Sequence, residues 1–412
     1  MRLRGRHFET GQPVEVRVEG ETIAAVDPRP DGVPEGTPEG TPEGGVLGGA
    51  GLWLAPALFD SQVNGFGGRD LNAPDTTPDD VAAVVRLLWE GGVARCCPTV
   101  TTQSPERMTA SLRAIRQAAE SDPQVAHAAV TLHIEGPYIS PEDGPRGAHP
   151  REHTRPPDLE EFRRLQDAAG GRIGYVTLAP ELPGAIPFIR RLAGEGVVVS
   201  LGHHAGTEED IRAAVDAGAS HCTHLGNGAH AVLPRHPNYI WEQLATDGLT
   251  AGIIADGHHL PPAVVKSFVR AKGLERTVLV SDAIEAAGWS PGRHIRHGHE
   301  GQVVEITPAG RIQVADTPYL AGSGLRLHQG VGNTVRYAGT TLAQTVHLAA
   351  RNPARIFGLG GRYGALAPGY AADLLLFRWD EESASLDVVA TVAAGRVVYQ
   401  ESHVSGPTSQ VV

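Results

Sequence analysis

The chain has 412 residues, more than a typical small domain and enough for one barrel of about 250 residues with a smaller module beside it. Its composition, 41% apolar, 5% aromatic and 20% charged, is that of an ordinary soluble globular protein and excludes a disulfide-rich scaffold. A formal net charge of −12 argues against nucleic acid or an anionic membrane as a partner. The 19 histidines make metal chemistry a hypothesis to test against the motifs.

The three cysteines, Cys96, Cys97 and Cys222, are too few for a disulfide framework, and two of them are adjacent. No apolar run of signal-peptide length opens the chain, and no stretch of 18 apolar residues occurs in it. The sequence therefore predicts a cytoplasmic protein with no membrane partner.

Short strands are expected in the first 55 residues. Apolar and polar residues alternate over 13–19 and 22–26, which is typical of half-buried strands. A tract with three Pro-Glu-Gly copies at 34–45 predicts a solvated loop. From residue 56 onward, apolar strands alternate with helical stretches, which is the rhythm of a parallel sheet.

The alternating region predicts an α/β fold, a (β/α)8 barrel of the TIM type rather than a doubly wound sheet. A β-rich insertion near 290–320, helical sequence up to Leu359 and strand patterns at 371–377 and 388–399 follow it. We predict a catalytic barrel over 56–363 and a small β-sandwich domain from both chain ends, 1–55 with 364–412. The eight barrel strands are expected to begin near Ala55, Val93, Ala126, Arg172, Gly196, Ala219, Thr250 and Arg276.

Polar side chains follow several of these strands. The third strand ends in Ile-Glu135, the fifth in Gly-His203, the sixth in Thr-His224 and the eighth in Ser-Asp282. Because the carboxyl ends of barrel strands meet at one mouth, these side chains are expected to converge. One carboxylate with two imidazoles is a common ligand set for a catalytic zinc-type ion. The pattern predicts Glu135, His203 and His224 as metal ligands and Asp282 as a catalytic base.

Each of these residues also has a structural interpretation. Glu135 could accept hydrogen bonds in a turn, and Asp282 could cap the helix that follows it. Either histidine alone could be a hydrogen-bonded core residue. His133 shares a strand face with Glu135 and is either a support for the site or a core residue. A structural role is expected for His204, His258 and Asp256, and a solvated face for His294, His297 and His299.

At this point the chain resembles the amidohydrolase superfamily and, within it, the N-acetylglucosamine-6-phosphate deacetylase family. The resemblance runs nearly end to end. It rests on the segments Pro56–Gly65, His133-Ile-Glu-Gly-Pro-Tyr-Ile-Ser-Pro, Arg146-Gly-Ala-His149-Pro, Gly202-His203, Thr223-His-Leu-Gly-Asn227, Ile253–His259, Val280-Ser-Asp282-Ala, Leu320-Ala-Gly-Ser323, Asn352-Pro-Ala-Arg355 and Pro368–Asp373.

The resemblance implies a metal-dependent homodimer that hydrolyses the acetamide of N-acetylglucosamine 6-phosphate to glucosamine 6-phosphate and acetate. It implies one divalent ion, zinc or iron, on Glu135, His203 and His224, with Asp282 as the proton carrier. His149 would polarise the substrate carbonyl, unless it is a surface histidine. Arg235 would bind the phosphate, unless it is a solvated loop arginine. The implied substrate contacts are Gln62, Ala148, Asn227, Gly228, Arg235 and His259.

Three departures from the family pattern affect the expected activity, and one of them is Gly202-His-His-Ala-Gly in place of the common Gly-His-Ser-x-Ala. Gln62-Val-Asn64 stands where binuclear amidohydrolases carry a His-x-His pair, which argues against a second metal. The segment from Gly228 to Trp241 differs from the family's usual one, and Tyr239 and Trp241 could reshape the pocket for the phosphate. An alternative is therefore an amidohydrolase acting on another N-acyl or cyclic amide, such as an unphosphorylated amino sugar or an N-acyl amino acid. A non-catalytic scaffold is a further alternative.

Overall fold

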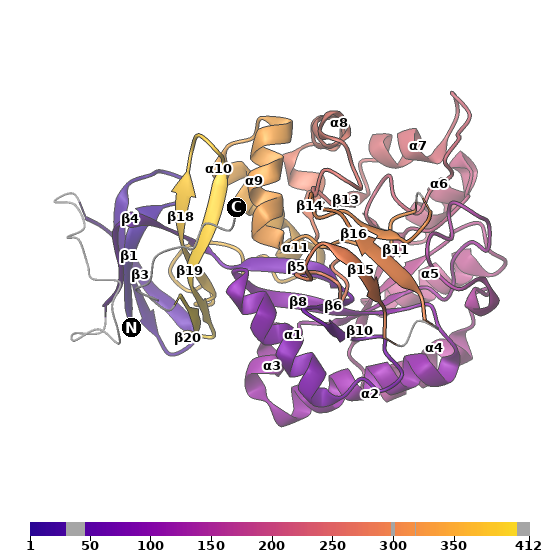
Figure 1. Cartoon of the computed structure of the whole chain (residues 1–412), viewed down its shortest axis with the longest axis horizontal. Coiled ribbons are helices and arrows are strands. Elements are labelled where there is room, and N and C mark those ends of the chain that lie inside the picture. The colour runs from indigo at the N-terminus through magenta and orange to yellow at the C-terminus, as the bar shows by residue number, and fades with distance from the viewer. Residues whose placement is uncertain (30–45, 298–300, 318, 402–412) are drawn as a thin grey trace.

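The computed structural model describes residues 1–29, 46–297, 301–317 and 319–401. Figure 1 shows a barrel wrapped by helices on one side of the molecule and a sheet formed from both chain ends on the other. The predicted Pro-Glu-Gly loop, His299 and the last residues of the predicted terminal domain, 402–412, lie outside the described residues.

Eight parallel strands form the barrel, as predicted. They are hydrogen-bonded in chain order, and a parallel bridge between Val63 and Ala283 joins the first strand to the segment after the last. The first two strands are buried along nearly their whole length, as expected for parallel strands covered by helices. The strands are β5 (Leu58–Val63), β8 (Val93–Thr101), β9 (Leu132–Glu135), β10 (Ile173–Leu178), β11 (Val198–Leu201), β12 (His221–Cys222), β13 (Thr250–Ile253) and β14 (Thr277–Leu279).

Helices cover the outside of the barrel (Figure 1). Local sequence determines where several of them begin. The Thr77 side chain accepts a hydrogen bond from the backbone N–H of Asp80, the Asp80 side chain accepts one from the backbone N–H of Thr77, and Pro78 takes the first helical position of α1. The helices are α1 (Pro78–Glu90), α2 (Pro105–Ser121), α3 (Pro123–Ala128), α4 (Leu159–Ala168), α5 (Ala185–Gly194), α6 (Glu208–Asp216), α7 (Tyr239–Ala245), α8 (Pro262–Lys272), α9 (Leu327–Ala338), α10 (Leu342–Ala349) and α11 (Arg351–Ile356).

The terminal strands form a seven-stranded sheet in the order β20-β19-β18-β4-β1-β2-β3. The central strand, β4, pairs parallel with β1 and antiparallel with β18, so it joins the two chain ends. The predicted small β-domain from both ends of the chain is therefore confirmed. Its strands are β1 (Arg2–His7), β2 (Pro13–Glu19), β3 (Thr22–Pro28), β4 (Val46–Pro56), β18 (Leu374–Asp380), β19 (Ser385–Ala393) and β20 (Arg396–Gln400).

A buried ion-pair cluster, which we call the junction cluster, ties this sheet to the barrel. Asp373, just before β18, accepts hydrogen bonds from Arg95 on β8 and from His127 in α3, both at 2.7 Å. The guanidinium of Arg95 also lies 3.9 Å from the ring centre of Tyr363. Both carboxylate oxygens of Asp373 therefore accept a hydrogen bond from the barrel side of the molecule.

The predicted insertion near 290–320 is a small antiparallel sheet of β15 (Gly292–Ile295), β16 (Val303–Ile306) and β17 (Ile312–Val314). Its own apolar cluster includes Val304, Ile306 and Ile312. The buried pair of Arg296 with Glu285 fixes it to the segment after β14. A further two-stranded ribbon, β6 (Gly65–Phe66) with β7 (Arg69–Asp70), follows β5.

Two predicted boundaries are wrong. The third barrel strand was expected near Ala126, but that segment is helix α3, which begins after the Asp122 cap with Pro123 at its first position, and β9 starts only at Leu132. The strand expected over 388–399 is a hairpin, because Ala394 and Gly395 adopt positive φ and turn the chain between β19 and β20.

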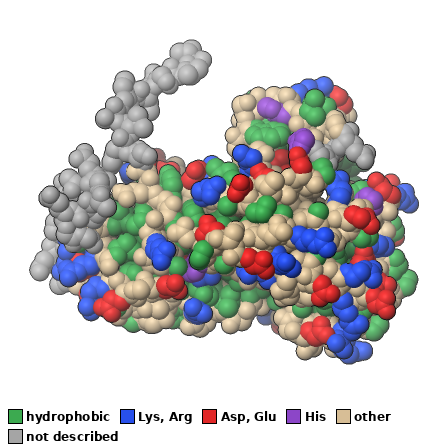
Figure 2. Space-filling view, turned by 90° about the horizontal axis from the view of Figure 1, so that it is seen from below, with side chains coloured by type: hydrophobic (Ala, Val, Ile, Leu, Met, Phe, Trp, Pro, Cys, Tyr) green, Lys and Arg blue, Asp and Glu red, His purple; other side chains and the backbone are tan. Residues whose placement is uncertain are grey.

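Basic and acidic side chains are interspersed on the face shown in Figure 2, without one large area of a single sign. In the described part of the chain, no helix is both long and apolar enough to cross a membrane.

Candidate functional site

Three of the four residues predicted at the barrel mouth have a left-handed backbone. The φ angle is +54° at His203, +28° at His224 and +51° at Asp282. Such residues are uncommon because Cβ crowds the backbone, and each costs about 1–3 kcal/mol. The other non-glycine residues with positive φ in the described chain lie in turns outside the barrel: Asp316, Ala384 and Ala394. Strain concentrated after β11, β12 and β14 marks this mouth as a candidate functional site.

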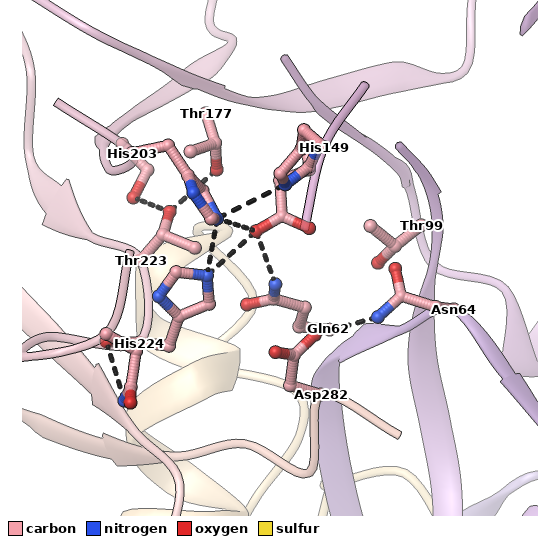
Figure 3. Close-up of polar contacts among 12 residues, drawn as sticks. Gln62, Asn64, Thr99, His149, Thr177, His203, Thr223, His224 and Asp282 are labelled. Atoms are coloured by element: carbon pink, nitrogen blue, oxygen red, sulfur yellow. Dashed lines mark hydrogen bonds and ion pairs between the residues drawn. The ribbon is translucent and has the colours of Figure 1, made fainter. Parts of the chain in front are cut away.

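The three predicted ligands, Glu135, His203 and His224, converge, and we call them the mouth cluster. Figure 3 shows the rings of His203 and His224 pointing toward each other. Glu135 ends β9, and its Oε1 lies 2.9 Å from Nε2 of His224 and 3.3 Å from Nε2 of His203. The two imidazole Nε2 atoms are 3.1 Å apart. Burial alone would raise the pKa of Glu135, but its contacts with the imidazoles of His203 and His224 hold that pKa well below its usual value. The carboxylate of Glu135 is therefore kept ionised inside the barrel.

The donors in the mouth cluster are too few for its acceptors. Nδ1 of His203 donates to the carbonyl oxygen of Pro145 at 2.8 Å, so Nε2 of a neutral His203 ring presents a lone pair. That lone pair faces Nε2 of His224 and the carboxylate of Glu135. Ligand atoms about 2.0–2.2 Å from a tetrahedral zinc-type ion stand roughly 3.3 Å apart, close to the spacings found here. The residues present fit a divalent metal ion.

His149 also reaches this cluster. Its Nε2 lies 3.3 Å from Nε2 of His203, and a ligand atom of each of Glu135, His149 and His203 lies within 4.8 Å of the other two. Burial and the neighbouring His203 lower the pKa of His149 to about 3, so its ring is neutral at physiological pH. The interpretation of His149 as a surface histidine is wrong, because its side chain is buried at the mouth.

Asp282 lies beside the cluster, and its Oδ1 accepts a hydrogen bond of 2.7 Å from Nδ2 of Asn64. Burial, followed by the negative charge of Glu135, raises the pKa of Asp282 to about 6. A carboxyl group with this pKa can both take up and return a proton near neutral pH.

Gln62 is placed differently from the prediction of a substrate contact. Its side chain is only 1% exposed, and Nε2 donates to Oε1 of Glu135 at 2.8 Å. Gln62 thus orients the carboxylate of the mouth cluster. The reason is strand geometry: Gln62 lies on β5, whose inward side chains face those of β9 across the barrel.

The structure brings some of the predicted substrate contacts to the mouth. Asn227 and Gly228 line a small cavity next to His203. A Cβ on Gly228 would stand 2.6 Å from Nδ1 of His203, so only glycine fits at this position. Ala148 is exposed and directly precedes His149.

The other two predicted contacts have contrasting surroundings. His259 is held by Asp256, whose Oδ2 lies 2.6 Å from Nδ1 and whose Oδ1 accepts backbone N–H bonds from 258 and 259. Asp256 therefore has the strand-end hydrogen-bonding role that was expected of it. Arg235 is exposed between β12 and α7, and its guanidinium makes no hydrogen bond or ion pair with another described residue.

The unusual segment 228–241 is attached to the loop that carries His149. Tyr239 is buried, and its hydroxyl bonds both the backbone N–H (2.8 Å) and Nδ1 (3.0 Å) of His230. Nε2 of His230 lies 3.2 Å from Oε2 of Glu142. Trp241, by contrast, is 54% exposed. Tyr239, but not Trp241, is thus part of the packing around the mouth.

The other histidines singled out in the sequence make contacts within the fold wherever the structure describes them. His133 lies between the hydroxyls of Thr99 and Thr177 and stacks on Tyr175 at 3.8 Å between ring centres, which makes it a core residue. His204 is buried against Gln243. The other contacts are those of His258 with Ala309, His294 with Ser290 and His297 with Asp75.

Asn64 is the residue of this site that sequence reasoning missed. It was noted only as part of Gln-x-Asn, although it follows Gln62 by two residues, immediately after the end of β5, and strand alternation turns every second side chain to the same side. That alternation was the available signal. Its partner Asp282 lies 218 residues later in the chain, so no local pattern could identify the contact.

Comparison with known proteins agrees with this geometry. The model of the amidohydrolase family matches residues 53–398. The chain is 34% identical to N-acetylgalactosamine-6-phosphate deacetylase from Escherichia coli O157:H7, with 88% of this chain and 89% of that protein covered. It is 36% identical to N-acetylglucosamine-6-phosphate deacetylase from Homo sapiens, with 84% and 83% covered.

A solved structure extends the similarity to the whole fold. A mutant of N-acetyl-D-glucosamine-6-phosphate deacetylase from Mycobacterium smegmatis, in complex with N-acetyl-D-glucosamine-6-phosphate, superposes with a TM-score of 0.81. Sequence identity is 29%, and 97% of this chain and 99% of that chain are covered. The chain belongs to the amidohydrolase family and, within it, to the N-acetylglucosamine-6-phosphate deacetylase family.

Proposed function

We propose that the protein is a metal-dependent deacetylase that hydrolyses the acetamide of an N-acetyl amino-sugar 6-phosphate, foremost N-acetylglucosamine 6-phosphate. The observation that carries this proposal is the mouth cluster of Glu135, His203 and His224 with Asp282 directly beside it. Relatives named for the glucosamine and for the galactosamine compound both match over more than four fifths of the chain, so the two sugars are the first substrates to test.

Glu135, His203 and His224 would hold one divalent ion, either zinc or iron. Such an ion supplies Lewis acidity: it polarises a carbonyl and lowers the pKa of water. Gln62 supports the ion by fixing the carboxylate of Glu135 through its amide N–H. Neutral His149 would donate a hydrogen bond from its ring to the carbonyl oxygen of the acetamide, where negative charge develops.

Asp282 would serve as base and then as acid. It first takes a proton from the attacking water and then gives it to the nitrogen of the leaving amine, because an unprotonated amide nitrogen is a poor leaving group. The raised pKa of its carboxyl suits both transfers.

The sugar and its phosphate would lie against Ala148, Asn227, Gly228 and His259, near the mouth. Arg235 has a free guanidinium on an exposed loop, and a guanidinium matches a phosphate group geometrically. An arginine placed in this way can serve the site of a second copy, so we propose a homodimer. The reduced, buried cysteines support action in the cytoplasm.

The test is acetate release by the purified, metal-loaded protein. The substrates to compare are N-acetylglucosamine 6-phosphate, N-acetylgalactosamine 6-phosphate, unphosphorylated N-acetylglucosamine, an N-acetyl amino acid and a cyclic amide. We expect turnover of one or both sugar phosphates to exceed that of the other compounds by at least about 100-fold. A factor of this size corresponds to about 2.7 kcal/mol of binding energy from the phosphate. Preferred cleavage of an unphosphorylated compound would instead support the alternative amidohydrolase activity.

Asp282→Asn tests the mechanism. We expect it to lower kcat by about 10²–10⁴-fold while bound metal, measured by elemental analysis, stays at the wild-type level. Activity close to that of the wild type would remove Asp282 from its proposed role.

A further inference from the structure

Asn64 lies next to Asp282 at the seam where the barrel closes. Backbone hydrogen bonds fix the two segments: the N–H of Asn64 donates to the carbonyl of Ala283 at 2.9 Å, and the N–H of Asp282 donates to the carbonyl of Gln62 at 3.1 Å. Asn64 is only 7% exposed. The relative position of the two side chains is thus set by the barrel itself rather than by a flexible loop.

The amide of Asn64 faces Asp282 with its donor side. An ionised carboxylate only accepts hydrogen bonds, so the atom 2.7 Å from Oδ1 of Asp282 must be the NH2 group. No hydrogen bond from another described residue reaches Oδ2 of Asp282. Oδ1 of Asp282 is therefore fixed by a hydrogen bond, and Oδ2 is available to exchange a proton with the substrate or with water.

Asn72, a second buried asparagine nearby, has hydrogen bonds to both polar atoms of its amide, whereas Asn64 does not. In Asn72, Oδ1 accepts the backbone N–H of Thr101 at 2.8 Å and Nδ2 donates to the carbonyl of Thr99 at 3.1 Å. In Asn64, Oδ1 is buried without a hydrogen-bond partner in the described structure. An unsatisfied buried acceptor costs about 1–3 kcal/mol, so a purely structural role would not favour this arrangement.

Gln62, two residues before Asn64, also uses its amide to hold a carboxylate of the site. Its amide donates to Glu135 of the mouth cluster, just as the amide of Asn64 donates to Asp282. Two amides of a single chain segment thus each hold one carboxylate of the site.

We propose that Asn64 is a positioning residue for the hydrolysis: its amide N–H holds Oδ1 of Asp282 so that Oδ2 is the atom that takes the proton from water and returns it to the leaving amine. The inference rests on the proposed function of Asp282. It adds a residue outside both the ligand set and the substrate contacts, and it assigns different roles to the two oxygens of one carboxylate.

The experiment is a double-mutant cycle with Asn64→Leu and Asp282→Asn, assayed on whichever N-acyl compound the wild type turns over best. We expect Asn64→Leu to lower kcat by about 10–100-fold, with KM changed by less than about threefold and metal content unchanged. In the Asp282→Asn background, the same substitution should lower the residual rate by less than about twofold, because the proton-carrying carboxylate that Asn64 positions is already gone.

The control is Asn352→Leu, which removes another buried amide, bonded to the carbonyls of Leu274 and Thr277. It should lower thermal stability and leave kcat per folded molecule unchanged. If Asn64→Leu does not fold, Asn64→Ala takes its place in the cycle.

Three outcomes would overturn the inference: wild-type kcat in the Asn64 variant, an equally large further loss in the Asp282→Asn background, or a loss explained by missing metal. They differ from failure of the proposed function. In that case the wild type would not cleave the sugar phosphates, or Asp282→Asn would retain activity.

Discussion

The mouth cluster and the junction cluster contain the same kinds of groups and differ in how those groups are satisfied. Each consists of a buried carboxylate with at least one histidine. At the junction, Oδ1 of Asp373 accepts from His127 and the backbone of Ala394, and Oδ2 accepts from Arg95. At the mouth, the lone pair on Nε2 of His203 faces the carboxylate of Glu135, which is itself an acceptor, at 3.3 Å.

The difference lies in donors rather than in burial, because only the junction cluster includes an arginine. Burial raises the pKa of Asp373, but His127 and Arg95 outweigh it and hold the pKa below its ordinary value. The junction is therefore complete as it stands and connects two parts of the fold. The groups at the mouth fit an added cation, and two of the three predicted ligands, His203 and His224, have a left-handed backbone.

Replacing one histidine in each cluster should distinguish metal binding at the mouth from stabilisation of the fold at the junction, and this is the largest effect that we expect. We expect His203→Ala to reduce acetate release to the background of the assay, since loss even of a hydrogen-bonding partner of a metal ligand costs 10–100-fold. Its free energy of unfolding without metal should change little, because a poorly satisfied group is removed. Metal analysis and chemical denaturation measure the two effects.

His127→Ala is the matched control. It removes a hydrogen bond to a buried charge, and we expect it to lower the free energy of unfolding by about 1–3 kcal/mol with kcat per folded molecule unchanged. The contrast between the clusters would be refuted if His203→Ala kept its bound metal or if His127→Ala lost it.

Removing the carboxylate of the junction should give the largest loss of stability. Asp373→Ala leaves Arg95 buried without its counter-charge, which we expect to lower the free energy of unfolding by about 3–5 kcal/mol. Glu381→Ala, at an exposed position of the same domain, should change it by less than about 0.5 kcal/mol. Equal denaturation midpoints for the two variants would show that the junction contributes nothing.

The smallest effect concerns pH. Burial lowers the pKa of His204 and His328 to about 4 and that of His221 to about 3. Because the unfolded chain protonates these rings near pH 6.5, stability should fall as pH drops below 6.5, with a slope of about 1.4 kcal/mol per pH unit for each ring. The depressed pKa of Asp373 adds a further loss below about pH 4.

Denaturation of wild type and His221→Gln between pH 7.5 and 5 measures this dependence. In the variant, the free energy of unfolding should depend on pH less steeply, by about 1.4 kcal/mol per pH unit, because one fewer proton is taken up on unfolding. Stability that increases on acidification would contradict it.

Much of the fold and the site was predictable because strand ends in a barrel meet at one place. Glu135, His203, His224 and Asp282 each follow a buried strand, so their convergence required only the count of strands. Hydrogen-bond partners across the barrel were not predictable in this way. The sequence around Gln62 predicted a substrate contact, because no local pattern shows that its amide donates a hydrogen bond to Glu135, 73 residues later.

Helix α3 shows a second limit. Its six residues form less than two turns, so the apolar residues near Ala126 are compatible with either a strand or a short helix. The Asp122 cap and Pro123 decide the outcome, and they are visible in the sequence only as a weak start signal.

The central position of β4 in the terminal sheet has a consequence for synthesis on the ribosome. β4 leaves the ribosome early, yet one of its two neighbours, β18, begins at Leu374. Until the last part of the chain emerges, one edge of β4 has no partner, and such an edge is a template for association between nascent chains. The barrel can close before the sheet does, so completion of the protein depends on a strand pairing of very large sequence separation, which is the slowest kind to form.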